Sequence, residues 1–379
     1  MTKAAELAKM GEVLTNSQLG GRRNVVINGG FTVSQRIGTT LTASSNNSYT
    51  LDRWNYYLGG SCRNSTQQLV SDNAKVVALN AASGQTFNNA LLADCTTAAA
   101  ISTNDLVGYI QTIEGSNSVP LAGQVCTLSF YVQSSVAGRY YVALKIGSAR
   151  SYIASYDIDS ADTWERKTIT LTMDTLTELE DGGSITNGAG FQMHFTLRAS
   201  NSSQLTDSIN QWVDGNFYAK SSMAAWGTST DHNWYLAGVQ LEVGSVATPF
   251  EHRTFGEELQ LCQRFFTKES AASGANYKSY AMGQAATTTV ARCSVFLPTP
   301  MRSTPSVVLS GNVNTFAGNS AGGSDACTAI TLSSDGDAGT DHVSVSLNVT
   351  VASGYVAGDA VELLSNDNTS TSFALDAEL

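Results

Sequence analysis

Hydrophobic and polar residues alternate in several segments between residues 24 and 253. In the segment 190–199 the apolar residues Phe191, Met193, Phe195 and Leu197 alternate with polar ones, which is the period of a β-strand with one face in the core and one in water. The same period occurs in the segments 126–133, 139–147, 165–173 and 235–244. Turn-forming stretches rich in Gly, Ser and Asn separate these segments, so the pattern predicts an antiparallel β-sandwich of the jelly-roll type. In the last segment the expected apolar row is Tyr235, Ala237, Val239, Leu241 and Val243.

A helical period appears near the start of the chain. Within residues 2–15, Leu7, Met10 and Leu14 recur at spacings of three and four and form one apolar stripe. Isolated helices shorter than about 12–15 residues are marginal in water. We therefore expect this helix to pack against sister helices in a short coiled coil or in a groove of another protein. Packing against its own domain is the alternative.

The first β-region ends at a proline corner. Thr248 precedes Pro249, and a residue before proline is driven out of the helical conformation, so the last strand is expected to finish there. Residues 255–266 then place Leu259, Cys262 and one of the two following phenylalanines on a helical stripe, with two glutamates in the first turn. This pattern predicts a short connecting helix.

Short strand-like segments continue from residue 267 to the end, separated by Gly- and Ser-rich loops. Three of the five prolines, Pro298, Pro300 and Pro305, lie close together, which argues against a central strand there. The pattern predicts a second, smaller β-sandwich. The predicted organisation is an attachment helix and linker at 1–23, a jelly roll at 24–253, a connecting helix at 254–266 and a C-terminal sandwich at 267–379.

Composition narrows the classes of partner. Charged residues make up only 14%, against a typical value of about 25%. The formal net charge is −11 and the 21 Lys and Arg residues are dispersed, which argues against nucleic acid, whose binding draws on clustered basic residues. No apolar run approaches the ~18 residues of a membrane span. The six cysteines have wide, irregular spacings and are predicted to be isolated buried thiols.

The sequence contains no convincing catalytic motif. The four histidines have no metal-binding spacing, and neither a nucleophile elbow nor a phosphate-binding loop occurs. Glu178 and Glu180 lie in an acidic turn, whereas a glycosidase would need two carboxylates facing each other across a cleft at ~5–9.5 Å. We therefore expect no enzymatic activity.

Three stretches resemble bacteriophage tail-fibre and receptor-binding proteins: NVVINGGFTVSQRIGTT at 24–40, SYTLDRW at 48–54, and 234–266, which contains GVQLEVG, TPFEHR and LCQRFF. The resemblance implies that residues 24–253 form a jelly roll like that of carbohydrate-binding modules. It also implies a homotrimer that attaches through its N-terminus to a tail adaptor, nozzle or baseplate protein and binds a glycan or protein of the host surface. No cofactor is expected, although the resemblance allows a structural Ca²⁺ with oxygen ligands from Asn28, Asp52 or Glu242.

Aromatic rings are the candidates for glycan binding, because a sugar packs its C–H face on a ring while amides and carboxylates bind its hydroxyls. Trp54 and Trp234 lie within the stretches that carry the resemblance and are expected in the core. The predicted ligand contacts are Trp226, Tyr56, Tyr57 and Tyr355. Trp212, Tyr277 and Tyr280 are further candidates, and the C-terminal tyrosines suit packing inside the sandwich equally well.

The function expected from the sequence is a non-enzymatic tail fibre that mediates host adsorption. The start of the chain lacks the apolar core of a signal peptide, so we expect assembly in the host cytoplasm and a final location in the virion tail. The alternatives are a decoration, connector or head-fibre protein without receptor binding, and a depolymerase. In a trimer, three weak glycan sites would add up to avid attachment.

Overall fold

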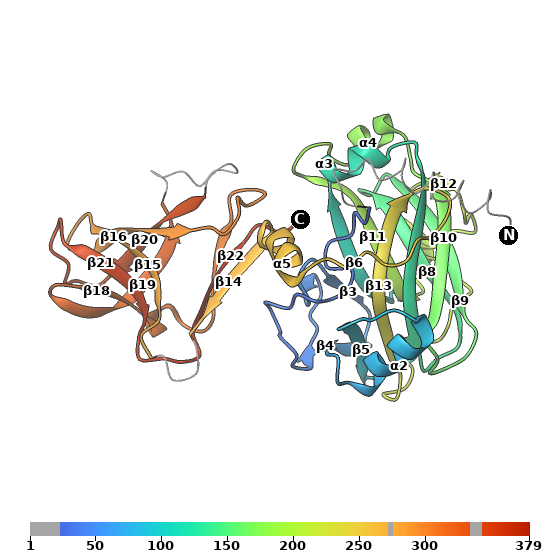
Figure 1. The fold of residues 1–379 in the computed structure, drawn as a ribbon, viewed down its shortest axis with the longest axis horizontal. Helices are drawn as coiled ribbons and strands as arrows, with labels where there is room; N and C mark the ends of the chain where they lie inside the picture. Colours follow the sequence, from blue (N-terminus) through green and yellow to red (C-terminus); the bar gives the residue numbers. More distant parts are fainter. Residues whose placement is uncertain (1–22, 272–275, 334–342) are drawn as a thin grey trace. The chain divides into compact units, whose positions relative to one another are not determined.

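The computed structural model describes residues 23–271, 276–333 and 343–379 (Figure 1). The predicted N-terminal helix with Leu7, Met10 and Leu14 lies outside them. The chain divides into two compact units: the first extends to Glu258 and includes Leu379, and the second comprises Leu259–Glu378. Both units are mainly β.

The first unit is a sandwich of two antiparallel sheets, as the alternating pattern predicted. The six-strand sheet has the order β1 (Thr42–Ala43), β4 (Arg63–Leu69), β5 (Ala90–Thr97), β13 (Asn233–Val243), β7 (Val125–Ser134) and β10 (Glu165–Thr172). The seven-strand sheet has the order β12 (Trp212–Asp214), β9 (Arg150–Ile158), β8 (Gly138–Ile146), β11 (Ala189–Ala199), β6 (Leu106–Glu114), β3 (Asn55–Gly59) and β2 (Ser48–Tyr49). Alternate residues of both sheets fill the core between them, among them Leu128, Phe130 and Phe195.

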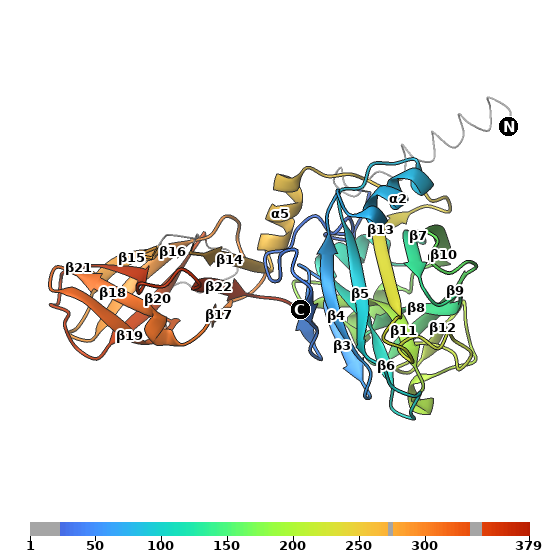
Figure 2. The same cartoon turned by 90° about the horizontal axis from the view of Figure 1, so that it is seen from below.

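Helices are short in both units. Helix α2 (Ala74–Ser83) begins at Asn73, whose side chain accepts a hydrogen bond from Lys75 N, and it lies against the outer face of the six-strand sheet (Figures 1 and 2). The other helical turns are α3 (Gly115–Ser118), η1 (Val119–Leu121), α4 (Leu176–Gly182), η2 (Ser202–Gln204), α5 (Phe255–Gln263) and η3 (Val313–Thr315). In the described part of the chain, no helix combines the length and apolar character needed to span a bilayer.

Strand β13 changes faces at a β-bulge. The sequence pattern predicted one apolar row from Tyr235 to Val243, but the register shifts between Ala237 and Gln240. Gly238 lies in this stretch with φ 56°, a left-handed conformation that glycine adopts without strain. Tyr235 and Ala237 therefore pack beneath α2, whereas Val239 and Leu241 lie in the sandwich core. The single-row prediction was wrong, because a bulge inserts a residue and reverses the alternation.

The outer face of the seven-strand sheet is covered. The alternation in β11 predicted that His194 and Thr196 face water, yet they are only 4% and 2% exposed. The segments on either side of β12, within residues 200–224, lie over this face. Side-chain hydrogen bonds attach them: Thr196 Oγ1 donates to Tyr218 O at 3.0 Å, and Ser151 Oγ donates to Gly215 O at 2.7 Å. Tyr218 and its neighbours thus supply a second apolar layer outside the sandwich.

The corner at 248–253 joins the two ends of the first unit. Glu251 accepts hydrogen bonds from Arg23 N at 3.1 Å and Asn24 N at 3.0 Å. The Arg253 guanidinium donates to Val26 O at 3.2 Å and pairs with Glu258 at 3.3 Å. These partly buried polar contacts hold the first described residues beside the end of the sandwich.

Strand β13 ends at Val243, earlier than the predicted end at Thr248. The turn that follows is stabilised by Glu242, which accepts hydrogen bonds from Thr248 N at 2.8 Å and Thr248 Oγ1 at 2.7 Å. Helix α5 begins with a reciprocal cap, in which Glu257 Oε2 accepts from Thr254 N at 2.9 Å and Thr254 Oγ1 accepts from Glu257 N at 3.3 Å. A helix therefore occupies most of the predicted segment 255–266.

The second unit combines a three-strand sheet with a closed six-strand barrel. The sheet has the order β14 (Phe266–Ser270), β22 (Ser372–Asp376) and β17 (Ser306–Leu309). The barrel consists of β15 (Ser279–Ala285), β16 (Val290–Phe296), β20 (Ser344–Val351), β19 (Gly323–Leu332), β18 (Phe316–Ser320) and β21 (Ala360–Ser365). The predicted sandwich was wrong here, because β21 pairs with both β15 and β18 and so closes one sheet on itself.

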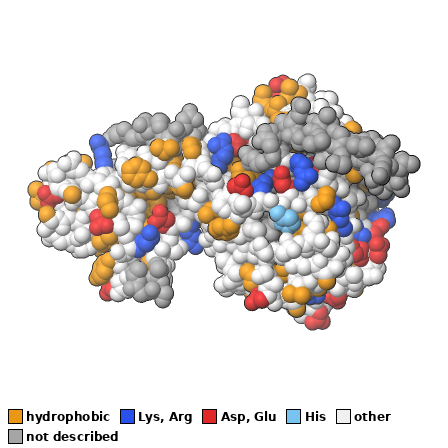
Figure 3. Space-filling view, in the orientation of Figure 1, with side chains coloured by type: hydrophobic (Ala, Val, Ile, Leu, Met, Phe, Trp, Pro, Cys, Tyr) orange, Lys and Arg blue, Asp and Glu red, His pale blue; other side chains and the backbone are white. Residues whose placement is uncertain are grey.

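On the face drawn in Figure 3, charged side chains occur singly or in small groups separated by uncharged surface.

Candidate functional site

Most of the aromatic residues predicted to bind a glycan are buried. Trp226 and Tyr56 have no exposed surface, and Tyr355 is 3% exposed. A ring in such a position offers no face to a sugar. Trp226 is enclosed because its loop folds inward, where Trp226 O accepts a hydrogen bond from Arg198 at 3.3 Å. Trp54 and Trp234 lie in the sandwich core, as predicted.

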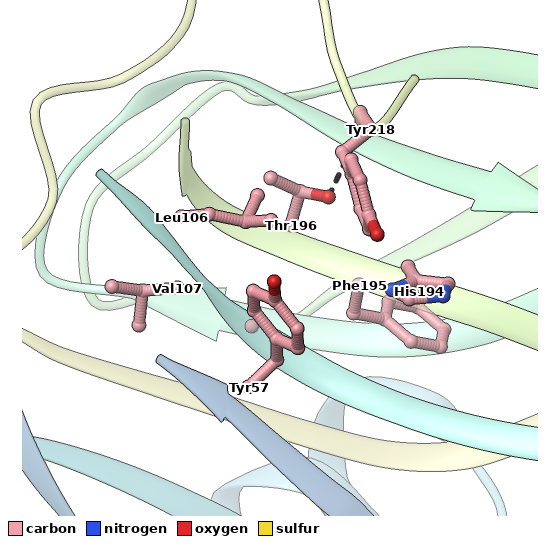
Figure 4. A pocket seen from close by; sticks show the side chains of 8 residues that line it. Tyr57, Leu106, Val107, His194, Phe195, Thr196 and Tyr218 are labelled. Atoms are coloured by element: carbon pink, nitrogen blue, oxygen red, sulfur yellow. Dashed lines mark hydrogen bonds between the residues drawn. The ribbon is translucent and has the colours of Figure 1, made fainter. Parts of the chain in front are cut away.

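Tyr57 lies half-buried on the outer face of the seven-strand sheet (Figure 4). Its ring stacks on Tyr218 with centroids 6.0 Å apart, and His194 meets Tyr218 edge-on at 4.9 Å. The cavity between these side chains has a volume of only about 10 Å³, which is the room of one water molecule. Tyr57 therefore belongs to a packed aromatic corner that is too small for a sugar ring.

A larger depression lies at one margin of the sandwich. Its volume is about 390 Å³, within the range of about 300–1,000 Å³ that is usual for ligand pockets. We call it the Trp212 groove. Its lining residues are Val125, Tyr152, Thr170, Leu171, Thr172, Asn210, Gln211 and Trp212.

The groove forms where the outermost strands of the two sheets meet. Strand β10 is the last strand of the six-strand sheet and β12 the last of the seven-strand sheet, and Figure 1 shows both at the same margin. Trp212 spans this margin: it pairs with Tyr152 of β9, and its Nε1 donates to Thr172 O of β10 at 2.9 Å. The two rings meet at 60° with centroids 5.6 Å apart. The indole is therefore held in one orientation while part of it remains accessible.

The rest of the groove supplies uncharged hydrogen-bonding groups. Thr170 and Thr172 are exposed on β10, and the amide side chains of Asn210 and Gln211 precede the indole in the sequence. Burial raises the pKa of Tyr152, so its phenol remains a neutral donor and acceptor at physiological pH. Among the described residues, no charged, histidine or cysteine side chain lines the groove. Its hydroxyls, amides and aromatic rings suit the binding of an uncharged ligand.

An ion cluster lies next to the groove on the same two strands. Arg150 and Asp214 are paired two positions beyond Tyr152 and Trp212 on β9 and β12. The same guanidinium also binds Asp174, with both N–O distances at 2.6 Å. Glu178 lies 3.4 Å from Arg150. Glu178 and Glu180 are two positions apart on α4 and so point to different sides of the helix. They do not form a pair of opposed carboxylates.

The calcium ligands suggested by the resemblance hold the fold together. Asp52 accepts hydrogen bonds from Gln35 N and Gln35 Nε2, both at 2.6 Å, while the Asn28 amide donates to Val33 O at 2.8 Å. Glu242 is engaged by the turn at Thr248. Among the described residues, no group of three or more His, Cys, Asp and Glu side chains could hold a metal. These side chains do not fit a calcium site.

Only Trp212 of the groove was a candidate from the sequence; Tyr152 and the threonines of β10 were missed. A sequence signal existed in Asn210-Gln211-Trp212, which combines two amides with an aromatic ring. The other lining residues come from three further segments that only the fold brings together. In the second unit, Tyr280 is buried and donates to Thr371 O at 3.1 Å, whereas Tyr277 is 60% exposed outside any described pocket.

A scan against protein-family models finds no match, and neither does a search of curated proteins. Solved structures similar to the chain include the enzymatically active domain of bacteriophage CBA120 tailspike protein 4, at 11% identity and TM-score 0.30, covering 58% of this chain and 21% of that one. The chain thus spans about a fifth of the tailspike domain.

Carbohydrate-binding modules are also among the similar structures. The family 11 module from Clostridium thermocellum, solved with a mixed-linked tetrasaccharide, has 12% identity and TM-score 0.29 and covers 55% of this chain and 100% of its own. TmCBM61, solved with β-1,4-galactotriose, has 8% identity and TM-score 0.30, with coverage of 59% and 100%. Likenesses this weak carry no weight in assigning a site or a function.

Proposed function

We propose that the first unit binds a glycan in the Trp212 groove and that the chain is a non-enzymatic phage tail fibre that attaches the virion to its host. The observation that supports binding is the half-buried indole of Trp212, fixed by its 2.9 Å hydrogen bond to Thr172 O beside a groove of about 390 Å³. The tail-fibre role rests on the resemblance of residues 24–40, 48–54 and 234–266 to phage fibres.

The chemistry of the groove favours a neutral sugar. A fixed indole offers a flat apolar surface to the C–H face of a pyranose and loses little conformational entropy on binding. The hydroxyls of Thr170 and Thr172 and the amides of Asn210 and Gln211 can pair with sugar hydroxyls as donors and acceptors. A shallow site of this kind binds weakly, and attachment strength then comes from several copies acting together.

A structural role for Trp212 is the second candidate. Strand β10 is an edge strand, and exposed edges invite pairing with other chains. The bond from Trp212 Nε1 to Thr172 O covers one carbonyl of this edge. In that case the groove binds nothing, and the chain is a decoration, connector or head-fibre protein.

A glycan array with the full-length chain tests the proposal. Binding should fall at least about tenfold in Trp212→Ala, because buried aromatic anchors typically contribute 2 kcal/mol or more, and it should weaken in Gln211→Ala. The matched control is Thr168→Ala, an exposed threonine on β10 outside the groove, which should bind as the wild type does. Circular dichroism of each variant confirms that it is folded.

Three results would contradict the proposal in different ways. Full binding by Trp212→Ala would place the glycan site elsewhere. Failure of the wild type to bind any glycan or to adsorb to host cells would favour the structural role. Shortening of host polysaccharide during incubation would identify a depolymerase.

A further inference from the structure

Two of the buried cysteines lie in contact. The Sγ atoms of Cys62 and Cys95 are 3.9 Å apart, and the side chains are 0% and 1% exposed. All six cysteines are buried and none is in a disulfide, but the prediction that each is isolated was wrong for this pair. The two residues are 33 positions apart in the sequence, so the strand pairing brings them together.

The neighbouring strands β4 and β5 position the pair. Cys95 lies opposite Asn64, and a register shift separates Asn64 from Arg63. Cys62 comes just before β4, two residues from Asn64, so the alternation of the strand directs its side chain to the same side as that of Cys95. A disulfide needs the sulfur atoms at about 2.05 Å. Side-chain rotation in a contacting pair can supply most of the remaining approach.

The surroundings of Cys62 leave room for its sulfur. A Cβ atom on residue 227 would lie 2.5 Å from Cys62 Sγ, but this residue is Gly227, with φ 82°. Burial raises the pKa of the Cys62 thiol, while its hydrogen bond with Cys95 and the positive charge of Arg198 oppose the rise. Burial and the proximity of Cys62 raise the pKa of Cys95 to about 12. The charge of Arg198 thus favours the thiolate of Cys62, and it is the thiolate that attacks a disulfide.

We propose that Cys62 and Cys95 form an intramolecular disulfide when the chain meets a small-molecule disulfide, such as oxidised glutathione, during folding or local opening. The Cys62 thiol loses its proton and attacks one sulfur of glutathione disulfide, releasing a glutathione thiolate. The Cys95 thiolate then attacks the mixed disulfide at Cys62 and releases the second glutathione thiolate. Two protein thiols are oxidised to one disulfide and glutathione disulfide is reduced, and the two protons lost by the cysteines are taken up by the two glutathione thiolates.

The bond would lock β4 to β5 and close the loop that carries α2. Because such a cross-link reduces the freedom of the unfolded chain, it stabilises the folded state. Both thiols are buried, so the reaction is expected to be slow in the native protein and fast during refolding.

Refolding the full-length chain in a buffer of reduced and oxidised glutathione tests the proposal. Peptide mapping without reductant should recover Cys62 and Cys95 in one cross-linked pair of peptides, with the intact mass lowered by two hydrogens. The melting temperature should rise on the order of 5 °C, and reduction should reverse the change. Because the mapping uses the wild type, it does not depend on any variant folding.

Serine variants test whether the cross-link forms between these two cysteines or involves others. Cys62→Ser and Cys95→Ser should lose both the cross-link and the gain in melting temperature, whereas Cys293→Ser, in the second unit, should keep both. Recovery of both cysteines as alkylated thiols after oxidative refolding would overturn the proposal. So would recovery of only a glutathione adduct, or of a cross-link to any other cysteine.

Discussion

Replacement of Lys145 by methionine is expected to stabilise the first unit at neutral pH. The Lys145 amine lies under the residues that cover the seven-strand sheet, 3.9 Å from the centroid of the Tyr218 ring, and the side chain is only 3% exposed. In the described part of the chain, no carboxylate forms an ion pair with it. Burial lowers the pKa of Lys145 from 10.5 to about 8. Folding therefore places a positive charge where water no longer solvates it.

The size of the effect follows from this lowering of the pKa. A decrease from 10.5 to about 8 corresponds to roughly 3 kcal/mol at pH 7, at about 1.36 kcal/mol per pKa unit. The cation–π contact with Tyr218 returns about 1 kcal/mol. Methionine keeps the apolar stem without the charge, so the free energy of unfolding should increase by about 2 kcal/mol.

The lowered pKa of Lys145 also determines how the stability difference between the variant and the wild type changes with pH. The folded pKa is below the unfolded one, so both states are protonated at pH 7 and the cost of burying the charge is fully present. Between pH 8 and pH 10.5 the folded amine loses its proton while the unfolded amine keeps it, and the wild type gains stability. The advantage of the methionine variant should therefore shrink by roughly 1 kcal/mol between pH 7 and pH 9.

Urea unfolding followed by tryptophan fluorescence measures this effect in the first unit alone, because all five tryptophans lie there. The matched control is Lys220→Met, whose amine is partly exposed and pairs with Asp207 at 3.2 Å. It should change stability by less than about 1 kcal/mol at either pH. A Lys145→Met variant that is less stable than the wild type at pH 7, or whose advantage is unchanged at pH 9, would refute the reasoning.

The same assay checks two further predictions. Arg198→Met should lower the free energy of unfolding by about 3–5 kcal/mol, because it leaves the buried carboxylate of Asp105 without its ion-pair partner. The control, Arg139→Met, breaks an exposed ion pair with Asp157 and should lower the free energy of unfolding by less than about 1 kcal/mol. Equal losses would contradict this. Burial and the charge of Lys145 hold the pKa of His194 well below its usual value, so only the unfolded state gains a proton as pH falls below about 6.5, and stability falls with it. His194→Gln should reduce this acid slope by up to about 1.4 kcal/mol per pH unit, and an unchanged slope would show that His194 is protonated in the fold.

The sandwich could be predicted from the sequence because strand alternation is a local signal. Leu128 and Phe130 face the core from β7, and Phe195 does so from β11, as their spacing indicated. The alternation gave a wrong prediction where a β-bulge, or a segment distant in the sequence, determines which face of a strand is buried. Gly238 reverses the alternation of β13, and the segments on either side of β12, within residues 200–224, cover the face of β11 that was predicted to contact water.

The closed barrel and the groove depend on pairings between distant segments. A barrel and a sandwich have the same alternation, and only the pairing of β21 with both β15 and β18 distinguishes them. The groove is assembled from four separate segments, and Trp212 alone was visible beforehand. The loop that carries Trp226 has the composition of an exposed loop. The loop nevertheless folds inward, where Trp226 O accepts a hydrogen bond from buried Arg198.

The stretches that resemble phage fibres contain polar residues that make particular contacts within the fold. In the corner at 248–253, Glu251 receives two backbone N–H groups and Arg253 bridges a carbonyl and a carboxylate. Buried polar groups need particular partners, whereas aliphatic core residues can exchange for others of similar volume. These stretches therefore describe the scaffold, whereas the Trp212 groove, where we propose a glycan site, is built from residues outside all of them.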